Sequence, residues 1–513
     1  MNLRTLLKNI FANWMGYAVT ILIGLFLSPL VVNRLGNTGY GVWTLVISLT
    51  GYFGLLDLGI RQSVGRYVAR YVGLRDPDNV NRTISTSMAM LAIAGTAVML
   101  ITIVLSSIFT NFFKVEPEFV SPARIVLLIG GLQVAIALPM GVFNTPLWAT
   151  ERFEVVTAIS VGSSILRSGL VVVALRSGYG VVALAWIALA CSCMEYAITV
   201  ITAKRLLPTL SVGRAWVDWQ RGRELLGFGV FRFIWIISNQ LVFYSSELVI
   251  GFFLGAGSIT PYAIAVSILS YMRNIISLST DTFAPAATRL DGHDDAQGLR
   301  ELLIMGTQMT LIVALPMCFG LLFLGHQFIV LWMGPEHAYS AVLLAVLVVP
   351  QFVSLAQYMS TRILICMGRH HMLAYIGIAE GVTNLILGAI LVQRMGLIGV
   401  AVGAAIPHII TSAVLIPWYT LRTLNMSWRE YITSYIRPLL ASAPAAGLSY
   451  FFSVTVTQLS WRVFLGEVLV VCASAAVTGW FVCVTPKQRV AVLLKIRQKL
   501  NLRPANEKST IEV

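Results

Sequence analysis

Charge is what this chain has least of. Only 11% of its 513 residues are Asp, Glu, Lys or Arg, whereas 57% are hydrophobic and the mean hydropathy is +0.82. A soluble protein of this length needs far more charge to cover its surface. The scarcity excludes a soluble globular protein and predicts an all-α polytopic membrane protein, whose architecture is set by the bilayer.

Several chemical signatures are missing as well. The sequence has no Walker motif, which argues against ATP hydrolysis by this chain, and no His/Cys/Asp cluster with metal-ligand spacing. Its six cysteines all fall inside apolar spans, where we expect small core residues and no disulfides. The connections between spans are mostly short, whereas a membrane glycosyltransferase or polymerase usually needs a large extramembrane loop. We therefore expect no enzyme and no cofactor.

Long apolar runs are abundant. With a window of about 19 residues, the sequence contains fourteen predicted spans. They lie near residues 10–32, 39–59, 84–109, 122–146, 153–175, 180–203, 225–254, 259–284, 301–325, 340–366, 371–393, 397–419, 431–456 and 462–484.

The basic residues are distributed unevenly between the two sides of these spans. Alternate connections carry 25 Lys and Arg on one side and 5 on the other. Since cytoplasmic loops carry the excess of positive charge, both termini are predicted to be cytoplasmic. The net charge of +14 is thus explained by membrane orientation, and nucleic-acid binding, which needs a basic patch on a soluble face, is not expected.

The stretch GYFGLLDLGIRQSVGRYVARY, residues 51–71, marks the cytoplasmic end of span two. Residues 61–71 read as a short amphipathic helix on the inner surface, with Val64, Tyr67, Val68 and Tyr71 on one face and arginines opposite, towards anionic headgroups. The segment around Trp216 and Trp219 reads as its counterpart after span six.

The chain repeats itself at an offset of about 217–222 residues. Arg176–Val181 resembles Arg394–Val400, and Leu35-Gly36 matches Leu254-Gly255. Because six spans is an even number, both repeats enter from the same side and are related by a pseudo-two-fold axis along the membrane normal. We expect an N-terminal lobe (1–205), a cytoplasmic amphipathic linker (206–224), a C-terminal lobe (225–425), two appended spans (426–485) and a basic cytoplasmic tail (486–513).

Polar residues recur at helical spacing in the first two spans of each repeat. Such stripes are expected where four helices line a central cleft, although packing through small residues is the alternative. The stripes consist of Asn13, Tyr17, Thr20, Gly24 and Ser28; Thr44, Ser48 and Gly51; Gln240, Tyr244 and Glu247; and Ser270, Arg273, Ser277 and Asp281.

Arg273 falls near mid-bilayer, where an unpaired guanidinium is costly. It must face water, an acid or an anionic ligand. We favour a phosphate contact, with a salt bridge to Glu247 as the alternative. Arg167 in span five is the residue of the same chemical type in the first repeat.

Acidic residues inside the spans suggest an ion site. Glu380 and Asn384 share one face of span eleven, and with Glu247 they could form a cation site or a proton carrier, to which span twelve could add Thr411 or His408. The alternative is hydrogen bonding between helices.

Asp57 reads as a capping or hinge residue paired with Arg61 rather than as a substrate contact. Together with Asp281 of the second repeat, these two residues are assigned to gating.

The run LGNTGYGVWTLVISLTGYFGLLDLGIRQSVGRYVARY, residues 35–71, resembles the N-terminal signature of O-antigen or Wzx-type polysaccharide repeat-unit flippases. These belong to the multidrug/oligosaccharidyl-lipid/polysaccharide exporter superfamily. The resemblance implies two lobes that alternate between inward-open and outward-open states, and movement of an undecaprenyl-diphosphate-linked oligosaccharide between leaflets. It also implies a diphosphate contact at Arg273 and a cation site at Glu247, Glu380, Asn384 and Thr411, with Na⁺ or H⁺ as the candidate coupling ion.

The resemblance also sets the expected partners. These are the lipid-linked glycan and membrane lipids, with a polysaccharide polymerase and a chain-length regulator as candidate protein partners. Two other functions stay open: an ion-coupled multidrug antiporter of the same superfamily, and a membrane glycosyltransferase or polymerase.

Overall fold

The protein is built of helices. The computed structural model describes residues 3–456 and 458–483, and no strand occurs in these ranges. Helices are required because a backbone in hydrocarbon must satisfy its polar groups within the segment. The first half contains α1 (Leu3–Phe53), η1 (Gly54–Asp57), α2 (Ile60–Gly73), α3 (Pro77–Phe112), α4 (Pro117–Met140), η2 (Gly141–Phe143), α5 (Asn144–Ala149), α6 (Phe153–Arg176) and α7 (Val181–Leu206).

The remainder of the chain continues this pattern. It contains η3 (Arg214–Trp216), α8 (Trp219–Phe253), η4 (Ala256–Ser258), α9 (Ile259–Asp281), α10 (Ala284–Gly292), α11 (Ala296–Met333), η5 (Pro335–His337), α12 (Tyr339–Val348), α13 (Gln351–Ser354), α14 (Gln357–Cys366), α15 (His370–Ile410), the π-helical segment η6 (Thr411–Leu415), α16 (Ile416–Leu424), α17 (Trp428–Thr455) and α18 (Trp461–Val482).

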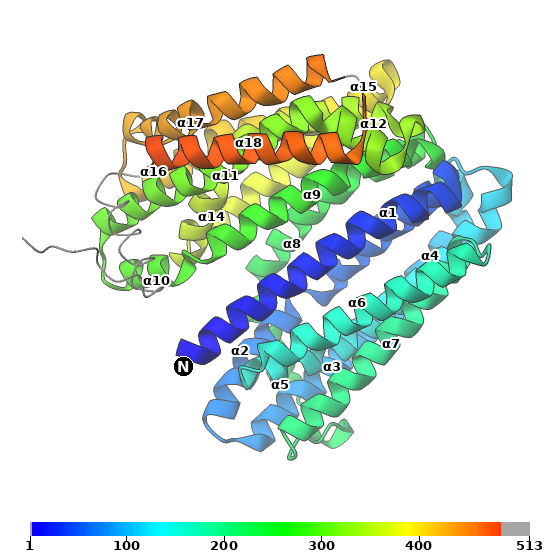
Figure 1. Ribbon diagram of the computed structural model, residues 1–513. Coiled ribbons are helices and arrows are strands. Elements are labelled where there is room, and N and C mark those ends of the chain that lie inside the picture. The colour runs from blue at the N-terminus through cyan, green and yellow to red at the C-terminus, as the bar shows by residue number, and fades with distance from the viewer. Residues whose placement is uncertain (1–2, 457, 484–513) are drawn as a thin grey trace, which may run out of the picture.

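The helices account for the fourteen predicted spans. Ten helices of the described chain are long and apolar enough to cross a membrane. Two of them, α1 and the stretch from α15 to α16, are each broken at a glycine and long enough for two crossings. The bent stretch Tyr339–Cys366 is apolar enough for one more crossing if it counts as a single span, and the 28-residue α17, which lies beside α18 in Figure 1, has the length of another.

The duplication is visible in the backbone. Gly36 (φ 71°, ψ 175°) and Gly255 (φ 100°, ψ 166°) both adopt a conformation that is essentially restricted to glycine, and each precedes the second crossing of its half. Gly178 and Gly396, between the fifth and sixth crossings, both have positive φ as well. The fold is therefore two six-helix halves related by a pseudo-two-fold axis, followed by two helices.

The two halves approach each other at one end of the molecule. In Figure 1, α2–α7 lie on one side of α1 and α9–α18 lie on the other, and the two groups come together where α1 bends. We call this end, which carries Gly36 and Gly255, the bend end. The largest apolar core is shared there by both halves, with Val42 and Leu45 of α1 packed among residues such as Ile259 and Ile264 of α9.

Helix α2 is amphipathic as predicted, but its apolar face packs on the protein. Val64, Val68 and Tyr71 are buried in a core with α3 and α5, while Arg66 and Arg70 are exposed. The counterpart expected around Trp216 and Trp219 is only one 3₁₀ turn followed directly by α8. The proposed lobe and linker boundaries stay a prediction, and residues 484–513, with the basic tail, lie outside the described residues.

Candidate functional site

The polar stripes of α1 lie against α8 and α9. The Tyr271 hydroxyl lies so close to Gly24 that a Cβ there would be 2.3 Å from it. Further along, the Gln240 side chain donates to the Gly51 carbonyl oxygen at 2.7 Å, and the Tyr52 hydroxyl donates to the Gln240 carbonyl oxygen at 3.2 Å. Both crossings of α1 thus contact the second half, and Gly51 and Gln240 are residues of two polar stripes that meet there. In this conformation these residues form part of the junction between the halves.

The other residues of the polar stripes lie elsewhere on α1, α8 and α9. Tyr17 and Thr20 are exposed on α1, and the Thr20 hydroxyl donates to the Gly16 carbonyl oxygen at 2.9 Å. The Asn13 side chain lies outside the described part of the chain. Ser48 is buried, whereas four further residues are partly exposed: Thr44, Tyr244, Ser270 and Ser277.

A small polar pocket lies inside the second half. Its volume is about 60 Å³ and it is lined by α8, α9, α15 and the segment around α13. Arg273 from α9, Gln351 from α13, and Glu380, Asn384 and His408 from α15 contribute its polar groups. The predicted phosphate-binding arginine and two predicted ion-site residues therefore share one pocket.

Glu380 has hydrogen-bond partners at both carboxylate oxygens. Oε1 lies 2.7 Å from His408 Nδ1, and the Thr411 hydroxyl donates to Oε2 at 2.7 Å. Glu380, Asn384 and Thr411 are buried. His408 is the residue of this site that an analysis based only on acidic and amide side chains would miss. Its signal in the sequence is a titratable side chain within an otherwise apolar span, directly after Pro407.

Arg273 does not form the alternative salt bridge. Its guanidinium lies over the Phe243 ring, 4.8 Å from the centroid, and within the described residues it has no carboxylate oxygen closer than 4.0 Å. Glu247 is near enough to act on it electrostatically, yet Glu247 does not line the pocket and its buried Oε2 has no hydrogen-bond partner. Arg167 is exposed on α6, in the other half.

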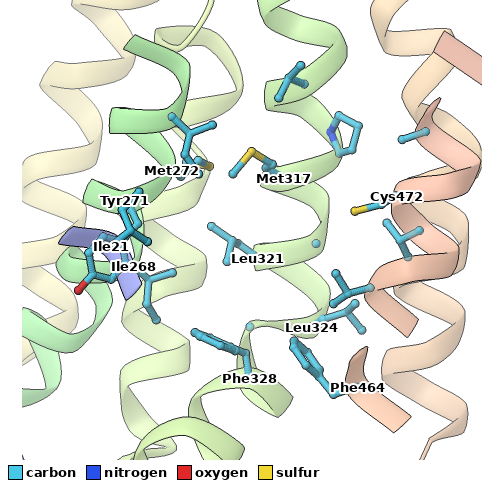
Figure 2. A pocket seen from close by; sticks show the side chains of 18 of the residues that line it. Ile21, Ile268, Tyr271, Met272, Met317, Leu321, Leu324, Phe328, Phe464 and Cys472 are labelled. Atoms are coloured by element: carbon cyan, nitrogen blue, oxygen red, sulfur yellow. The ribbon is translucent and has the colours of Figure 1, made fainter. Parts of the chain in front are cut away.

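An apolar groove adjoins the same helix, α9. It has a volume of about 740 Å³, and its walls come from α1, α9, α11 and α18. Figure 2 shows methionine, leucine and phenylalanine side chains from these walls pointing into it, and the residues labelled there include Ile21, Met272, Met317, Leu321, Phe328 and Phe464. Such a groove accepts an extended hydrocarbon and offers almost nothing to a polar group.

Main-chain hydrogen bonds join the two halves at the bend end. Lys114, between α3 and α4, donates its N–H to the Gly251 carbonyl oxygen (3.2 Å), and its own carbonyl oxygen accepts from the Ala256 N–H (3.0 Å). The Lys114 ammonium also donates to the Phe253 carbonyl oxygen at 2.8 Å. We call these four residues the latch.

Two further contacts tighten the latch. Gly41 of α1 packs directly on the Ala256 carbonyl oxygen, and the buried Thr260 hydroxyl donates to the Asn37 carbonyl oxygen at 2.7 Å. These contacts hold the halves closed at the bend end.

Spans two and eight each end in an aspartate that forms an ion pair, at the end of the span remote from the bend end. The Asp57 carboxylate accepts from the Arg61 side chain and main-chain N–H, both at 3.2 Å, which confirms the predicted pairing. Asp281, which ends α9, is paired with Arg362 of α14. Asp57 is buried and Asp281 is not, so the first pair is the more shielded one.

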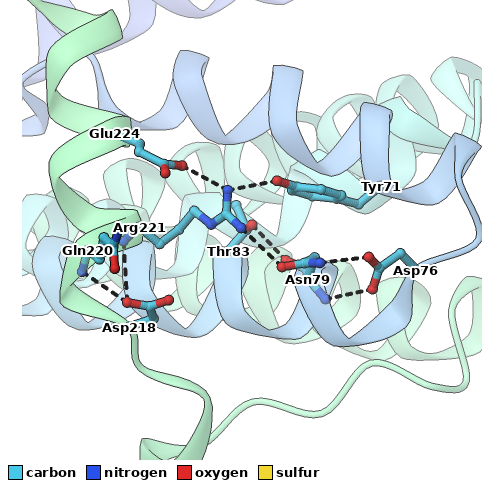
Figure 3. A network of polar contacts seen from close by, with 8 residues as sticks. All are labelled: Tyr71, Asp76, Asn79, Thr83, Asp218, Gln220, Arg221 and Glu224. Atoms are coloured by element: carbon cyan, nitrogen blue, oxygen red, sulfur yellow. Dashed lines mark hydrogen bonds and ion pairs between the residues drawn. The ribbon is translucent and has the colours of Figure 1, made fainter.

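The segment between the halves is anchored by Arg221, as Figure 3 shows. Its guanidinium donates to the Tyr71 hydroxyl (2.7 Å), Asn79 Oδ1 (3.0 Å) and Glu224 Oε2 (2.8 Å). Asn79 in turn donates to Asp76, and these hydrogen bonds hold the pKa of the Asp76 carboxyl below its ordinary value. The first turn of α8 is therefore fixed to α2 and α3 of the first half.

Solved structures share this architecture. A lipid II flippase MurJ in an inward closed conformation superposes with a TM-score of 0.73 at 13% identity, covering 93% of this chain and 98% of that one. An inward-facing multidrug resistance MATE family transporter of the MOP superfamily superposes with a TM-score of 0.63 at 17% identity, covering 79% and 95%. This chain therefore has the fold that these MurJ and MATE structures share.

The sequence comparisons identify the family. The family model described as "Polysaccharide biosynthesis protein" matches residues 6–291, more than half of the chain, and this chain belongs to that family. This confirms the resemblance that we read from residues 35–71.

Curated relatives agree with that assignment. The Bacillus subtilis (strain 168) "Uncharacterized membrane protein EpsK" is 22% identical over 496 residues, covering 96% of this chain and 98% of that protein. A "Putative O-antigen transporter" of Shigella flexneri is 23% identical over 431 residues, covering 82% and 99%. A "Probable flippase AglR" of Haloferax volcanii is 23% identical over 396 residues, covering 74% and 76%.

Proposed function

We propose that this protein is a flippase that moves a polyprenyl-diphosphate-linked oligosaccharide repeat unit across the bacterial cytoplasmic membrane by alternating access, for surface polysaccharide synthesis. Family membership and the relatives named as transporter or flippase support this function. The excess of basic residues supports a cytoplasmic location for both termini, which makes the bend end extracytoplasmic. No enzymatic step is part of the proposal.

The observation that carries the proposal is the double role of α9. Ile268, Met272 and Ile275 of this helix line the apolar groove, while Arg273 points into the polar pocket. A lipid-linked sugar has the same division, with a hydrocarbon tail joined to a charged, hydrated head. The head cannot enter hydrocarbon unaided, because its charge and hydroxyls would lose water without replacement. The groove would hold the tail while polar residues replace that water.

The remaining site residues receive roles within this scheme. Arg273 would contact the diphosphate, and Arg167 would assist from the first half. Once the halves separate, the sugar hydroxyls would contact residues of the polar stripes. These residues are Asn13, Tyr17, Thr20, Thr44, Ser48, Gln240, Tyr244, Ser270 and Ser277. A coupling cation would act at Glu380, Asn384 and Thr411, with Glu247 nearby. Asp57, Arg61 and Asp281 would control the cytoplasmic opening.

The latch fits alternating access. It closes the extracytoplasmic end, and release of the head on that side requires its hydrogen bonds to break. The other participants in the pathway would be membrane lipids, with a polysaccharide polymerase and a chain-length regulator as candidate partners.

The test is a transfer assay with the purified full-length protein in proteoliposomes. The probe is a polyprenyl-diphosphate carrying one fluorescently labelled sugar, and its arrival in the other leaflet is read by a membrane-impermeant quencher. We expect transfer by the native protein and a loss of about tenfold or more in Arg273→Ala, because the diphosphate loses its charged contact. Arg273→Lys should recover part of the rate, and Arg34→Ala, at a connection on the extracytoplasmic side, should leave it unchanged.

Other outcomes separate the competing functions. A native protein that moves cationic drugs but not the lipid-linked probe would indicate a multidrug antiporter. Sugar incorporation into a longer glycan without transfer between leaflets would indicate a glycosyltransferase or polymerase. Either result would overturn the flippase proposal.

A further inference from the structure

A polar pocket opens at the surface of the bend end, beside the latch. Its volume is about 790 Å³, and both halves supply its walls. The first half contributes Thr38, Lys114 and Glu116, and the second half contributes the turn at residues 254–258. Lys114 and Glu116 are exposed. We call this hollow the surface pocket.

A second apolar groove adjoins the surface pocket, because Phe113 lines both. Its volume is about 480 Å³, and hydrocarbon side chains of α1, α3, α8 and α15 form its walls. It shares no lining residue with the groove of Figure 2. Along α3 it extends from Phe112 to Leu105, which is about 10 Å of helix leading away from the surface pocket. We call it the side groove.

We propose that these two hollows bind one molecule of phosphatidylethanolamine and that this lipid stabilises the closed bend end. An acyl chain lies in the side groove, and the headgroup lies in the surface pocket. The inference goes beyond the proposed function, because the bound lipid is a component of the membrane and is not transported. A phospholipid has the same division as the site, since its acyl chains need apolar surroundings and its headgroup needs polar partners and water.

The charges of the surface pocket select the headgroup. The Lys114 ammonium has three donors and gives one to the Phe253 carbonyl oxygen, which leaves two for a phosphate. Glu116 accepts from the Thr38 hydroxyl at Oε1 (2.7 Å), which leaves its second oxygen for an ammonium group. No ion pair joins Lys114 to Glu116 in the part of the chain that the structure describes.

Phosphatidylethanolamine complements both of these charges, because its headgroup carries one phosphate and one primary ammonium. Phosphatidylglycerol has the phosphate but lacks the cation. Phosphatidylcholine has both charges, but its methylated nitrogen has no N–H to donate to Glu116. The three headgroups therefore distinguish a contact with Lys114 alone from a contact with both residues.

Occupancy of the site is coupled to closure because its walls belong to both halves. In the side groove, Phe112 of α3 lies in the first half, whereas Phe252 of α8 and Leu385 of α15 lie in the second. The surface pocket is divided in the same way, and the latch crosses between its two walls. A ligand that contacts both halves binds the closed conformation more tightly and shifts the population towards it.

The test measures closure in vesicles of defined composition, without any transported substrate. Thr260 is fully buried beside the latch. Thr260→Cys, in the full-length protein without its six native cysteines, therefore reports opening through its reaction with a membrane-impermeant thiol reagent. Ser177→Cys, in the exposed connection between α6 and α7, corrects for protein orientation and for any effect of the lipid on the reagent.

The vesicles contain phosphatidylglycerol mixed with either phosphatidylethanolamine or phosphatidylcholine of the same acyl chains. We expect corrected labelling to be about threefold or more slower with phosphatidylethanolamine, because the occupied site favours the closed conformation. Equal rates in the two mixtures would overturn the proposal. Vesicles of phosphatidylglycerol alone should label as fast as those with phosphatidylcholine, and protection equal to that by phosphatidylethanolamine would also overturn it.

Two acid variants separate a headgroup contact from a general effect of the lipid on the membrane. Glu116→Gln keeps an oxygen that can accept from Thr38 but loses the charge that attracts the amine, so the two mixtures should give equal rates. Glu118→Gln is the matched control and should keep the difference, because Glu118 is exposed in the first turn of α4 and does not line the surface pocket. A difference that persists in Glu116→Gln would contradict the assigned contact.

A phosphatidylethanolamine with a photoactivatable diazirine in its acyl chain locates the bound lipid. Its adducts should concentrate on the peptides that contain Phe112 and Phe252. Ala389→Trp fills the side groove and should abolish most of this yield, whereas Ile390→Trp, at an exposed position of α15 outside the groove, should preserve it. Adducts spread evenly over the spans, or equal yields in the two variants, would overturn the assignment of the acyl chain to the side groove.

Discussion

Gly41 of α1 and Ala256 of η4 touch across the junction of the two halves, with no room for a side chain at residue 41. A Cβ on Gly41 would lie 1.9 Å from the Ala256 carbonyl oxygen, which is main chain and cannot rotate away. Closure of the bend end therefore depends on the absence of one methyl group.

This contact predicts the effect of Gly41→Ala. Crowding in a packed interface costs about 1–3 kcal/mol, so the closed state should lose population. A cysteine in place of Thr260, which is buried beside the latch, should then react about tenfold faster with a membrane-impermeant thiol reagent. Gly54→Ala is the control, because a Cβ there meets nothing within 4 Å. Unchanged labelling in Gly41→Ala would show that the halves can close without this contact.

The paired bends predict a different effect of glycine substitution. Gly36 has positive φ and open space around it, so Gly36→Ala should act only through backbone strain and lower the free energy of unfolding by about 1–3 kcal/mol. Gly65→Ala lies inside α2, also in open space, and should be neutral or stabilising by about 0.5–1 kcal/mol. Thermal unfolding in detergent compares the two, and equal stabilities would contradict the assigned role of the bend.

The Asp57–Arg61 pair predicts non-additive mutations. Arg61→Ala leaves a carboxylate that is only 6% exposed without its partner, which should destabilise the protein by about 1–3 kcal/mol. Adding Asp57→Asn should recover part of this loss, because the buried charge is gone. Thermal unfolding of the two single variants and the double variant measures the coupling, and strictly additive losses would argue against a functional pair.

The apolar groove predicts a steric block. Gly320 lines the groove with open space at its Cβ position, so Gly320→Leu should fill part of it and slow transfer of the lipid-linked probe by about tenfold, equivalent to about 1.4 kcal/mol. Gly447→Leu places the same side chain in open space on the exposed face of α17 and serves as control. Equal transfer rates in the two variants would show that the hydrocarbon tail does not pass through the groove.

The sequence by itself determined the crossings, the repeat, the bends at Gly36 and Gly255, and the family. These features follow from local properties: hydrocarbon selects apolar helices of about 20 residues, and only glycine tolerates the backbone at the bends. The Asp57–Arg61 pair was also predictable, because the two residues are only four apart in the sequence and lie on either side of the short turn between η1 and α2.

Only the tertiary structure decided which polar groups meet in the membrane. Glu380 and His408 lie 28 residues apart and approach each other because the chain breaks at Gly396 and returns. Arg273 could have faced Glu247 or the junction with α1, and the packing of α9 turned it over Phe243 into the pocket of the second half. Helical spacing defines which residues share a face, but the rotation of each helix against its neighbours depends on how all of them pack.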